Sequence, residues 1–292
     1  AATALANMVS TGKMDLDASF YEYVSYYPKK KCDFTIRQLA SHTAGIRGYQ
    51  GTEYGLNKPL SIKDSIEIFK DDDLLFEPGT DYFYNSYDWV LISLAMQEVS
   101  GIPFEKYVQD KVLSPLGMKG TFAPECYPER SRDLRKITNQ EVSTALDRTN
   151  LSEFYTKNRI GGFRKSIPVN NFYKLAGGGY LSTSEDIAKF GQAHLDGNIL
   201  SKEILSPFLT SEMINGNKTY YGLGWQVSED KKGRPYYGHI GNGVGGYSNF
   251  FIYPDRQMVF AILINCTNPN VQKEIDEAVD IFLSQEENNY LS

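Results

Sequence analysis

Hydrophobic residues recur at helical spacing in several separate stretches of the first two thirds of the chain. Residues 87–100 show this most clearly, because Trp89, Ile92 and Ala95 fall on one side of a helix that would bury that side. The same criterion predicts further helices at residues 1–10, 34–42, 61–69, 104–112 and 185–195. Two serines, Ser61 and Ser184, directly precede helices and are expected to cap their first turns.

The last third of the chain changes to the alternating pattern of β-strands. Strands are predicted at residues 222–227, 235–240, 247–253 and 258–265, with an amphipathic helix after them at residues 271–282. Residues 258–264 are apolar at nearly every position, which is typical of a central strand covered on both faces. Hairpin turns are expected at residues 228–233 and 254–255.

These elements predict a mixed α/β (α+β) fold, in which an antiparallel sheet of at least four strands is flanked by helices and adjoins a helical region. We expect a single unit over residues 1–292, with helices and loops at about 14–180 and the sheet with its helices at about 181–292. Residues 120–169 lack strong periodicity and are expected to form long loops and short strands. Long loops in a compact domain usually border a binding site.

Composition and charge exclude several function classes. The net charge of -6 gives no basic surface for nucleic acid, and no apolar run is long enough for a transmembrane helix. The three cysteines are an odd number without short spacing, so neither a disulfide framework nor a CxxC motif is predicted. The three histidines also share no short spacing, so a zinc site is not expected.

Polar side chains gather directly before the helix predicted at residues 87–100. A turn at Pro78 and Gly79 is followed by Tyr84, Asn85 and Ser86, which precede the apolar run. Three hydrogen-bonding side chains at the start of a buried helix are well placed for chemistry. Considered alone, a tyrosine such as Tyr84 is more often a packed residue than a catalyst, so its function depends on what other stretches bring to it.

Five blocks of sequence resemble motifs of the serine β-lactamase-related and penicillin-binding-protein-like hydrolases. They are GKMDLD at 12–17, IRQLASHTAGI at 36–46, the stretch at 76–101, AGGGYLST at 176–183 and HIG at 239–241. The blocks occur in the family's order and at its spacing, across nearly the whole chain. Within this class C β-lactamase-like group, the chain is most similar to the LACTB-like branch.

The resemblance implies a β-lactamase/transpeptidase-like fold and a serine hydrolase that forms an acyl-enzyme with a peptide, a D-amino-acid peptide, a β-lactam or an ester. It implies that Tyr84 serves in a proton relay; because a free phenol has a pKa of about 10, its ionised form would need a nearby cation. His239, on an edge strand, would steer a substrate carboxylate or assist proton transfer. Ser86, Gly241 and Gly243 would contact the substrate or the oxyanion. The family's box has asparagine where Ser86 stands, so altered substrate choice is expected.

The family's Ser-x-x-Lys box supplies the nucleophile. Counting back from the block at 12–17 places this box directly before Ala1, so we expect it in an upstream segment. Residues 10–13 and 228–231 fit the pattern literally, but Gly12 ends a helix in the first and the second lies in an acidic turn. The alternative is a non-catalytic relative that binds peptides or cell-wall fragments, or that acts as a scaffold.

Other implications of the resemblance concern ligands and compartment. A small-molecule or peptide substrate is expected, without a metal or an organic cofactor. The glycine-rich run at 241–246 matches GxGxxG, but a strand rather than a helix is predicted to follow it, which argues against a dinucleotide site. We expect His42 to form structural hydrogen bonds at a helix end, and His194 to lie on the surface or in the core. Bacterial relatives are commonly exported, so an exported or periplasmic location is implied.

Overall fold

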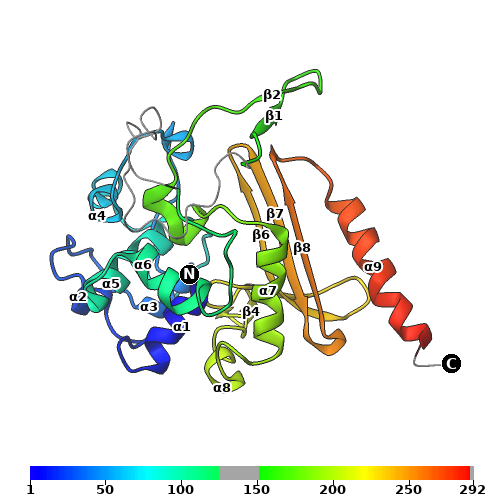
Figure 1. The fold of residues 1–292 in the computed structure, drawn as a ribbon. Coiled ribbons are helices and arrows are strands. Elements are labelled where there is room, and N and C mark those ends of the chain that lie inside the picture. The colour runs from blue at the N-terminus through cyan, green and yellow to red at the C-terminus, as the bar shows by residue number, and fades with distance from the viewer. Residues whose placement is uncertain (125–150, 290–292) are drawn as a thin grey trace, which may run out of the picture.

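The computed structural model describes residues 1–124 and 151–289, and the first of these stretches is helical (Figure 1). Its elements are α1 (Ala2–Ser10), α2 (Phe20–Tyr23), α3 (Ile36–Ala40), η1 (Glu53–Gly55), α4 (Ile62–Ser65), η2 (Ile66–Ile68), α5 (Tyr87–Ser100), α6 (Phe104–Val108) and η3 (Gln109–Leu113). The helices predicted at 1–10 and 87–100 are confirmed. Those predicted at 34–42 and 61–69 are shorter than expected, because α3 ends at Ala40 and η2 continues α4 as a 3-10 turn.

Helix α5 lies at the centre of the helical part. Residues 87–96 are buried without interruption, so the helix is enclosed on all sides rather than on the single side that its spacing predicted. Helices α2, α3, α4 and α6 and the 3-10 helix η6 (Phe172–Gly177) all contact it. Gly101 ends α5 in the left-handed conformation, with φ of 69°, which only glycine adopts without strain. The segment before α5 is therefore held against a rigid, buried helix.

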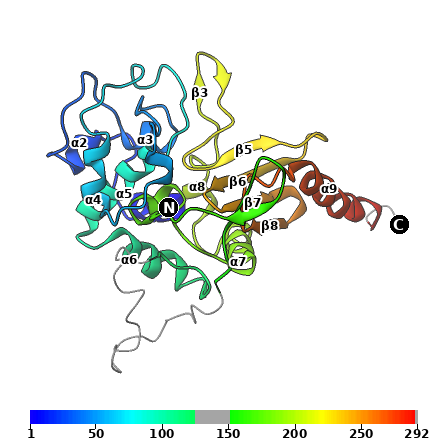
Figure 2. The same ribbon diagram turned by 90° about the horizontal axis from the view of Figure 1, so that it is seen from above.

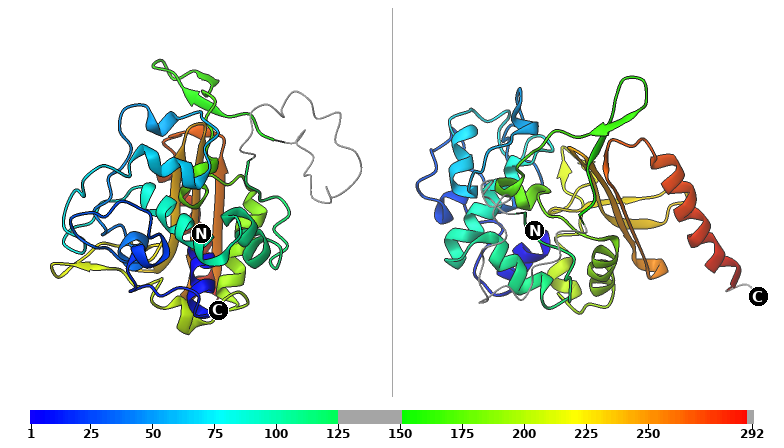
Figure 3. Two further views of the ribbon diagram at one scale, coloured as in Figure 1. Left: turned by 90° about the vertical axis from the view of Figure 1, so that its left-hand side faces the viewer. Right: turned by 45° about the horizontal axis from the view of Figure 1, so that its top comes forward.

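The sheet follows in the last third of the chain. Strands β5 (Gln226–Glu229), β6 (Pro235–Gly243), β7 (Gly246–Tyr253) and β8 (Met258–Ile264) are antiparallel and lie in the order β5-β6-β7-β8. This confirms the predicted antiparallel sheet of at least four strands. Helix α7 (Ser184–Leu195) covers one face of the sheet and α9 (Gln272–Asn289) lies along the other (Figures 1 and 3).

Strand β8 lies at an edge of the sheet, so the prediction of a central strand is wrong. Its side chains contact a helix on each face. Val259 faces α7, where a Cβ added to Gly191 would lie 2.5 Å from the Val259 Cγ1. Phe260 packs against Phe282 of α9, with ring centroids 6.3 Å apart. The helices on the two faces of β8 explain why its residues are apolar at nearly every position, although only one strand of the described residues pairs with it.

Two predicted boundaries are displaced. The strand predicted to start at Gly222 starts at Gln226, because Gly224 turns the chain with φ of 82° and packs so closely on Trp89 that an added Cβ would lie 2.4 Å from that ring. Helix α7 is capped by Thr183 rather than by Ser184. The Thr183 side chain accepts the backbone N–H of the third helical residue.

The remaining elements are short. They are β1 (Tyr155–Lys157), β2 (Phe163–Lys165), α8 (Lys202–Leu205), β3 (Met213–Ile214), β4 (Asn217–Lys218), η7 (Pro254–Arg256) and β9 (Cys266–Thr267). Strands β1 and β2 confirm short strands in the loop-rich stretch predicted at 120–169, of which residues 125–150 lie outside the described residues. Strand β9 runs parallel to β1. Within residues 1–124 and 151–289, no helix combines the length and the apolar character that a membrane span needs.

The helical part lies beside the sheet, and specific hydrogen bonds join the two (Figures 2 and 3). The Thr3 hydroxyl of α1 lies 3.1 Å from the His194 Nε2 of α7, so His194 lies in the core, one of the two places expected for it. The backbone N–H of Gly224, before β5, donates to the Ala40 carbonyl at the end of α3 at 2.9 Å. The boundary between the two parts is where the candidate site lies.

Candidate active site

Tyr84 and His239 lie next to each other, with ring centroids 5.8 Å apart. Tyr84 belongs to the segment before α5, and His239 belongs to β6. Tyr221, which precedes β5, contacts both, with its ring 5.8 Å from Tyr84 and 5.7 Å from His239. The helical part and the sheet thus supply one predicted residue each, and a third residue joins them.

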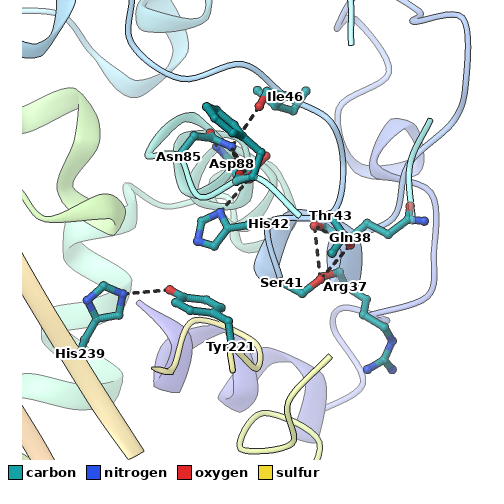
Figure 4. Close-up of polar contacts among 11 residues, drawn as sticks. Arg37, Gln38, Ser41, His42, Thr43, Ile46, Asn85, Asp88, Tyr221 and His239 are labelled. Atoms are coloured by element: carbon teal, nitrogen blue, oxygen red, sulfur yellow. Dashed lines mark hydrogen bonds and ion pairs between the residues drawn. The ribbon is translucent and has the colours of Figure 1, made fainter. Parts of the chain in front are cut away.

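Both ring nitrogens of His239 are paired, and Figure 4 shows the bond to Tyr221. The Nδ1 lies 2.7 Å from the Ile240 carbonyl oxygen, so it carries the proton and donates it. The Nε2 accepts from the Tyr221 hydroxyl at 3.0 Å. Burial lowers the pKa of His239 to about 4, so the ring is uncharged at neutral pH. The uncharged ring can accept a proton at Nε2, although burial makes it a weaker base, and it does not attract a carboxylate by charge.

His239 lies where β6 loses one of its neighbours. Strand β5 pairs with β6 only as far as Gly238, so the rest of β6 has β7 on one side alone. The Gln226 side chain accepts the Ile240 N–H there, at 3.2 Å. The predicted edge position is therefore confirmed for the half of β6 that carries His239, whereas the first half lies inside the sheet.

Gly241 and Gly243 follow His239 at two-residue steps, so all three lie on the same face of β6. Gly241 pairs with Ser248, and a Cβ added to Gly241 would lie 2.6 Å from the Ser248 Oγ. Gly243 pairs with Gly246 at the end of the hairpin. Beyond His239, this face of β6 thus has two positions without side chains. The predicted contacts of Gly241 and Gly243 with a substrate stay a prediction.

A buried histidine–carboxylate pair lies behind the two tyrosines. The His42 Nδ1 is 2.8 Å from the Asp88 Oδ2, and neither side chain is more than 1% exposed. Asn85 donates its Nδ2 to the same carboxyl oxygen at 2.7 Å and accepts the Asp88 backbone N–H at 2.9 Å. The His42 ring centroid lies 4.5 Å from that of Tyr84 and 4.9 Å from that of Tyr221. The rings of Tyr84 and Tyr221 therefore both pack against the His42 ring of this buried pair.

The surroundings of His42 hold it in an unusual conformation. It follows α3 with φ of 62°, a left-handed value that a non-glycine residue adopts only under constraint, and its carbonyl accepts the Phe83 N–H at 2.9 Å. Burial lowers the pKa of His42 to about 3 and raises that of Asp88 well above its usual range. Among the described residues, no group bonds the His42 Nε2, which points toward Tyr221 and His239 (Figure 4). The expected structural hydrogen bond is confirmed, and one nitrogen is left for the site.

Tyr84 is 47% exposed, and one side of its ring packs on His42. Burial raises the pKa of its hydroxyl above the usual value, and no cation of the described residues opposes this shift. The protonated phenol is therefore the favoured form of Tyr84 in this arrangement, and the cation that a phenolate would need is not supplied by these residues.

Ser86 connects two of the motif blocks. Burial raises the pKa of Tyr49, and a hydrogen bond from the Ser86 side chain opposes that rise. Gly177, in the AGGGYLST block, packs closely on Ser86, since a Cβ added there would lie 3.2 Å from the Ser86 Cβ. The residue that departs from the family's asparagine therefore has a partner in Tyr49, and its contact with substrate stays a prediction.

Asp88 and Tyr221 were not predicted as members of the site. A carboxylate inside an otherwise apolar helical run is the signal that could have identified Asp88, because a buried charge needs a partner. Tyr221 is one of 21 tyrosines and carries no local signal. Among the described residues, no group of three or more histidine, cysteine, aspartate or glutamate side chains is arranged to hold a metal ion.

Comparison with known proteins identifies sequence relatives of nearly the whole chain. A family model described as Beta-lactamase matches residues 1–283. The human serine beta-lactamase-like protein LACTB, mitochondrial, is 25% identical over an alignment that covers 87% of this chain and 60% of that protein. Penicillin-binding protein 4* of Bacillus subtilis is 24% identical, covering 84% of this chain and 53% of that protein. The chain thus spans only part of the length of these relatives.

Solved structures share the fold. The D-amino acid amidase from Ochrobactrum anthropi SV3, in complex with D-phenylalanine, superposes with a TM-score of 0.79 at 19% identity, covering 97% of this chain and 81% of that chain. A penicillin-binding protein from Bacillus halodurans gives a TM-score of 0.74 at 21% identity, covering 95% and 81%. These similarities confirm the predicted β-lactamase/transpeptidase-like fold.

Proposed function

The chain belongs to the beta-lactamase family, and on this basis we propose that it is a serine hydrolase that acts on an amide or an ester through an acyl-enzyme. The observation that carries the proposal is the meeting of Tyr84, Tyr221 and His239 where the helical part joins the sheet. Acyl transfer by a serine needs groups that accept and donate protons beside the reacting carbonyl.

The nucleophile is proposed to be the serine of a Ser-x-x-Lys box that precedes residue 1 of this chain. Its Oγ attacks the carbonyl carbon and loses a proton, and the leaving nitrogen or oxygen gains one as the carbonyl bond to it breaks. The neutral phenol of Tyr84 is suited to donate to the leaving group. The uncharged Nε2 of His239, which bonds the Tyr221 hydroxyl, is suited to receive a proton through that hydroxyl.

The proposed substrates are peptides, D-amino-acid peptides, β-lactams and simple esters. The D-amino acid amidase with the same fold supports an amide next to a D-configured residue as the first choice to test. Gly241 and Gly243 leave the last part of one face of β6, beyond His239, without side chains, which would let a substrate backbone lie along the strand there. Ser86, with Tyr49 as its partner, is the proposed source of a preference that differs from that of relatives with asparagine.

The test is covalent labelling of the full-length protein with a fluorophosphonate and with a fluorescent penicillin. We expect one adduct, located by peptide mass spectrometry on the serine of the upstream box and lost when that serine is replaced by alanine. Labelling that survives the replacement rejects the mechanism. A folded protein that reacts with neither probe supports instead the non-catalytic alternative, a binding protein for peptides or cell-wall fragments.

A further inference from the structure

Lys174 is a buried cation that the proposed chemistry does not use. It is 7% exposed, and within the described part of the chain no carboxylate pairs with it. Its Nζ donates to the Tyr54 carbonyl oxygen at 3.1 Å. Its other neighbours are aromatic rings, with the Nζ 4.7 Å from the ring centroid of Tyr49, 5.4 Å from that of Tyr173 and 5.7 Å from that of Tyr54. Rings at these distances attract a cation through their faces.

The backbone directs Lys174 into this cage. Helix η6 is kinked at Lys174 itself, with φ of -112° and ψ of 31°, three residues before the first glycine of the AGGGYLST block. The kink lies beside Tyr54 of η1, to whose carbonyl the lysine bonds. The rings of Tyr49 and Tyr54 meet edge to face, with centroids 5.7 Å apart, so the ammonium contacts both members of one aromatic pair.

Each member of that pair reaches one side of the candidate site. Tyr49 packs edge to face on Tyr87, the first residue of α5, with ring centroids 5.1 Å apart, and Ser86 directly precedes that residue. The Tyr54 hydroxyl donates to the Asn242 carbonyl of β6 at 3.0 Å, on the strand segment that carries Gly241 and Gly243. We propose that Lys174 is a positioning residue, whose ammonium holds Tyr49 and Tyr54 in place and thereby fixes the spacing between Ser86 and strand β6. A role of this spacing in catalysis rests on the proposed function. The effect of Lys174 on the spacing does not depend on that function.

The energetics of Lys174 fit positioning better than general stabilisation. Burial lowers its pKa to about 8, so the folded protein disfavours the charge that the unfolded chain carries up to a pKa near 10.5. Between these values the unfolded chain binds more protons, so the contribution of this group to stability rises with pH while its cationic contacts are lost. A buried charge that lowers stability is retained where it serves a site.

Other groups around the ammonium keep their charge state in this pH window. Burial raises the pKa of Tyr49 and Tyr54 above the usual value and that of Tyr173 to about 12, so all three stay neutral. Glu53, on the same turn as Tyr54, stays ionised: burial raises its pKa, but the hydrogen bonds from Arg47, the Gln50 N–H and Tyr87, with the Arg47 charge, together lower it below the usual value. A change between pH 7 and pH 9 at this place therefore reports the lysine.

The test uses the full-length protein and four variants. Lys174→Met removes the charge at similar length, Lys174→Arg supplies a cation that stays charged, and Tyr54→Phe removes only the hydroxyl that reaches β6. Lys189→Met is the control, since Lys189 lies on the surface of α7 and is 44% exposed. Hydrogen–deuterium exchange gives protection factors for residues 240–243 and 53–56 at pH 7 and pH 9, and urea unfolding gives the overall stability.

We expect Lys174→Met and Tyr54→Phe to lower the protection factors at residues 240–243 about tenfold, because a cation–π contact or the hydrogen bond to β6 is lost. The overall stability of Lys174→Met should be unchanged or higher. The wild type should lose the same protection between pH 7 and pH 9, whereas Lys174→Arg should keep it. In a protein that reacts with an ester substrate, Lys174→Met should raise KM more than it lowers kcat.

Unchanged protection at residues 240–243 in Lys174→Met overturns the inference, as does a loss of overall stability with no local change, which would mark a merely structural lysine. The exchange experiment and the covalent labelling test the two proposals separately. A protein that reacts with neither covalent probe but shows the local changes refutes the hydrolase proposal alone. A protein that reacts with the probes but shows unchanged exchange refutes the positioning role alone.

Discussion

His42 and Asp88 form a hydrogen-bonded pair inside the protein, with Nδ1 and Oδ2 2.8 Å apart and almost no exposure to solvent. The shifts in their pKa values favour the uncharged form of each partner, so the pair avoids the cost of a buried charge. Because the ring of Tyr84 rests on that of His42, the orientation of the proposed proton donor depends on a contact that no solvent reaches.

Removal of Asp88 is expected to destabilise the protein. Asp88→Ala leaves the buried His42 Nδ1 without a partner, which costs about 1–3 kcal/mol, whereas the Asn85 amide keeps its bonds to the Ile46 and Phe83 carbonyls. Urea unfolding measures the loss. Asp110→Ala is the control, because its ion pair with Lys106 is on the surface and is worth about 0–1 kcal/mol. Equal losses of unfolding free energy in the two variants would show that the buried pair contributes no more to stability than a surface ion pair.

Tyr84→Phe should slow acylation of the full-length protein by about 10² or more, since it removes the proton that the leaving group receives. The rate is measured with a chromogenic ester and with penicillin. Tyr82→Phe is the matched control, because Tyr82 lies two residues earlier, near the same His42 ring at 6.3 Å, but outside the contact with His239. An equal effect of both substitutions would assign the loss to packing rather than to proton transfer.

The activity is expected to be level between about pH 6 and pH 7 and to fall in acid, with a midpoint near the pKa of His239, which burial lowers to about 4. The imidazole accepts a proton only while it is neutral, so activity is present above that pKa and is lost as the pH falls through it. The pH dependence of the acylation rate measures this. An acid limb centred near 6.5 would show that His239 is not held neutral by its surroundings.

His194 should make the fold less stable in acid. Burial lowers its pKa to about 4 from an unfolded value near 6.5, so the unfolded chain binds more protons between these values. Stability from this group is complete above pH 6.5 and falls by up to roughly 3 kcal/mol as the pH decreases toward 4. Urea unfolding at several pH values measures the slope. His194→Gln, which keeps a partner for Thr3, should show a shallower slope than the wild type.

Two glycines of β6 should respond differently to alanine. A Cβ at Gly238 would lie 1.9 Å from the Phe250 carbonyl, so Gly238→Ala should lower stability by more than about 4 kcal/mol or prevent folding. At Gly241 the nearest atom is the rotatable Ser248 Oγ, so Gly241→Ala should cost about 1 kcal/mol at most. Its acylation rate should nevertheless fall at least tenfold if substrate lies along this face. An unchanged rate would remove Gly241 from the site.

The elements that could be predicted were those with an uninterrupted local pattern. The bounds of α5 and β7 were predicted to within one residue, because turn-forming residues, Gly101 and Pro254, end the two runs. The central position predicted for β8 was wrong because hydrophobicity records that both faces of a strand are covered, and not whether another strand pairs along each of its edges. The strand start at Gln226 depended on Gly224 packing against Trp89, a contact between residues far apart in the sequence.

The candidate site divides in the same way. Tyr84 and His239 could be placed because each lies in a block that resembles a known motif. Asp88, Tyr221 and Lys174 could not, because their importance comes from partners that only the folded chain brings together. The uncharged state of His239 likewise depends on its burial in the folded protein, which no local pattern of residues reports.

The hydrogen bond from the Tyr54 hydroxyl to the Asn242 carbonyl links η1 to β6 across 188 residues of chain. Tyr84 and His239 are also remote in sequence, so neither part of the molecule contains both residues of the site. A nascent or damaged copy in which the sheet has not docked would display its tyrosines and histidines separately, with ordinary reactivity. Any acyl-transfer activity therefore requires the sheet to be docked on the helical part, and the appearance of that activity during refolding would report the docking.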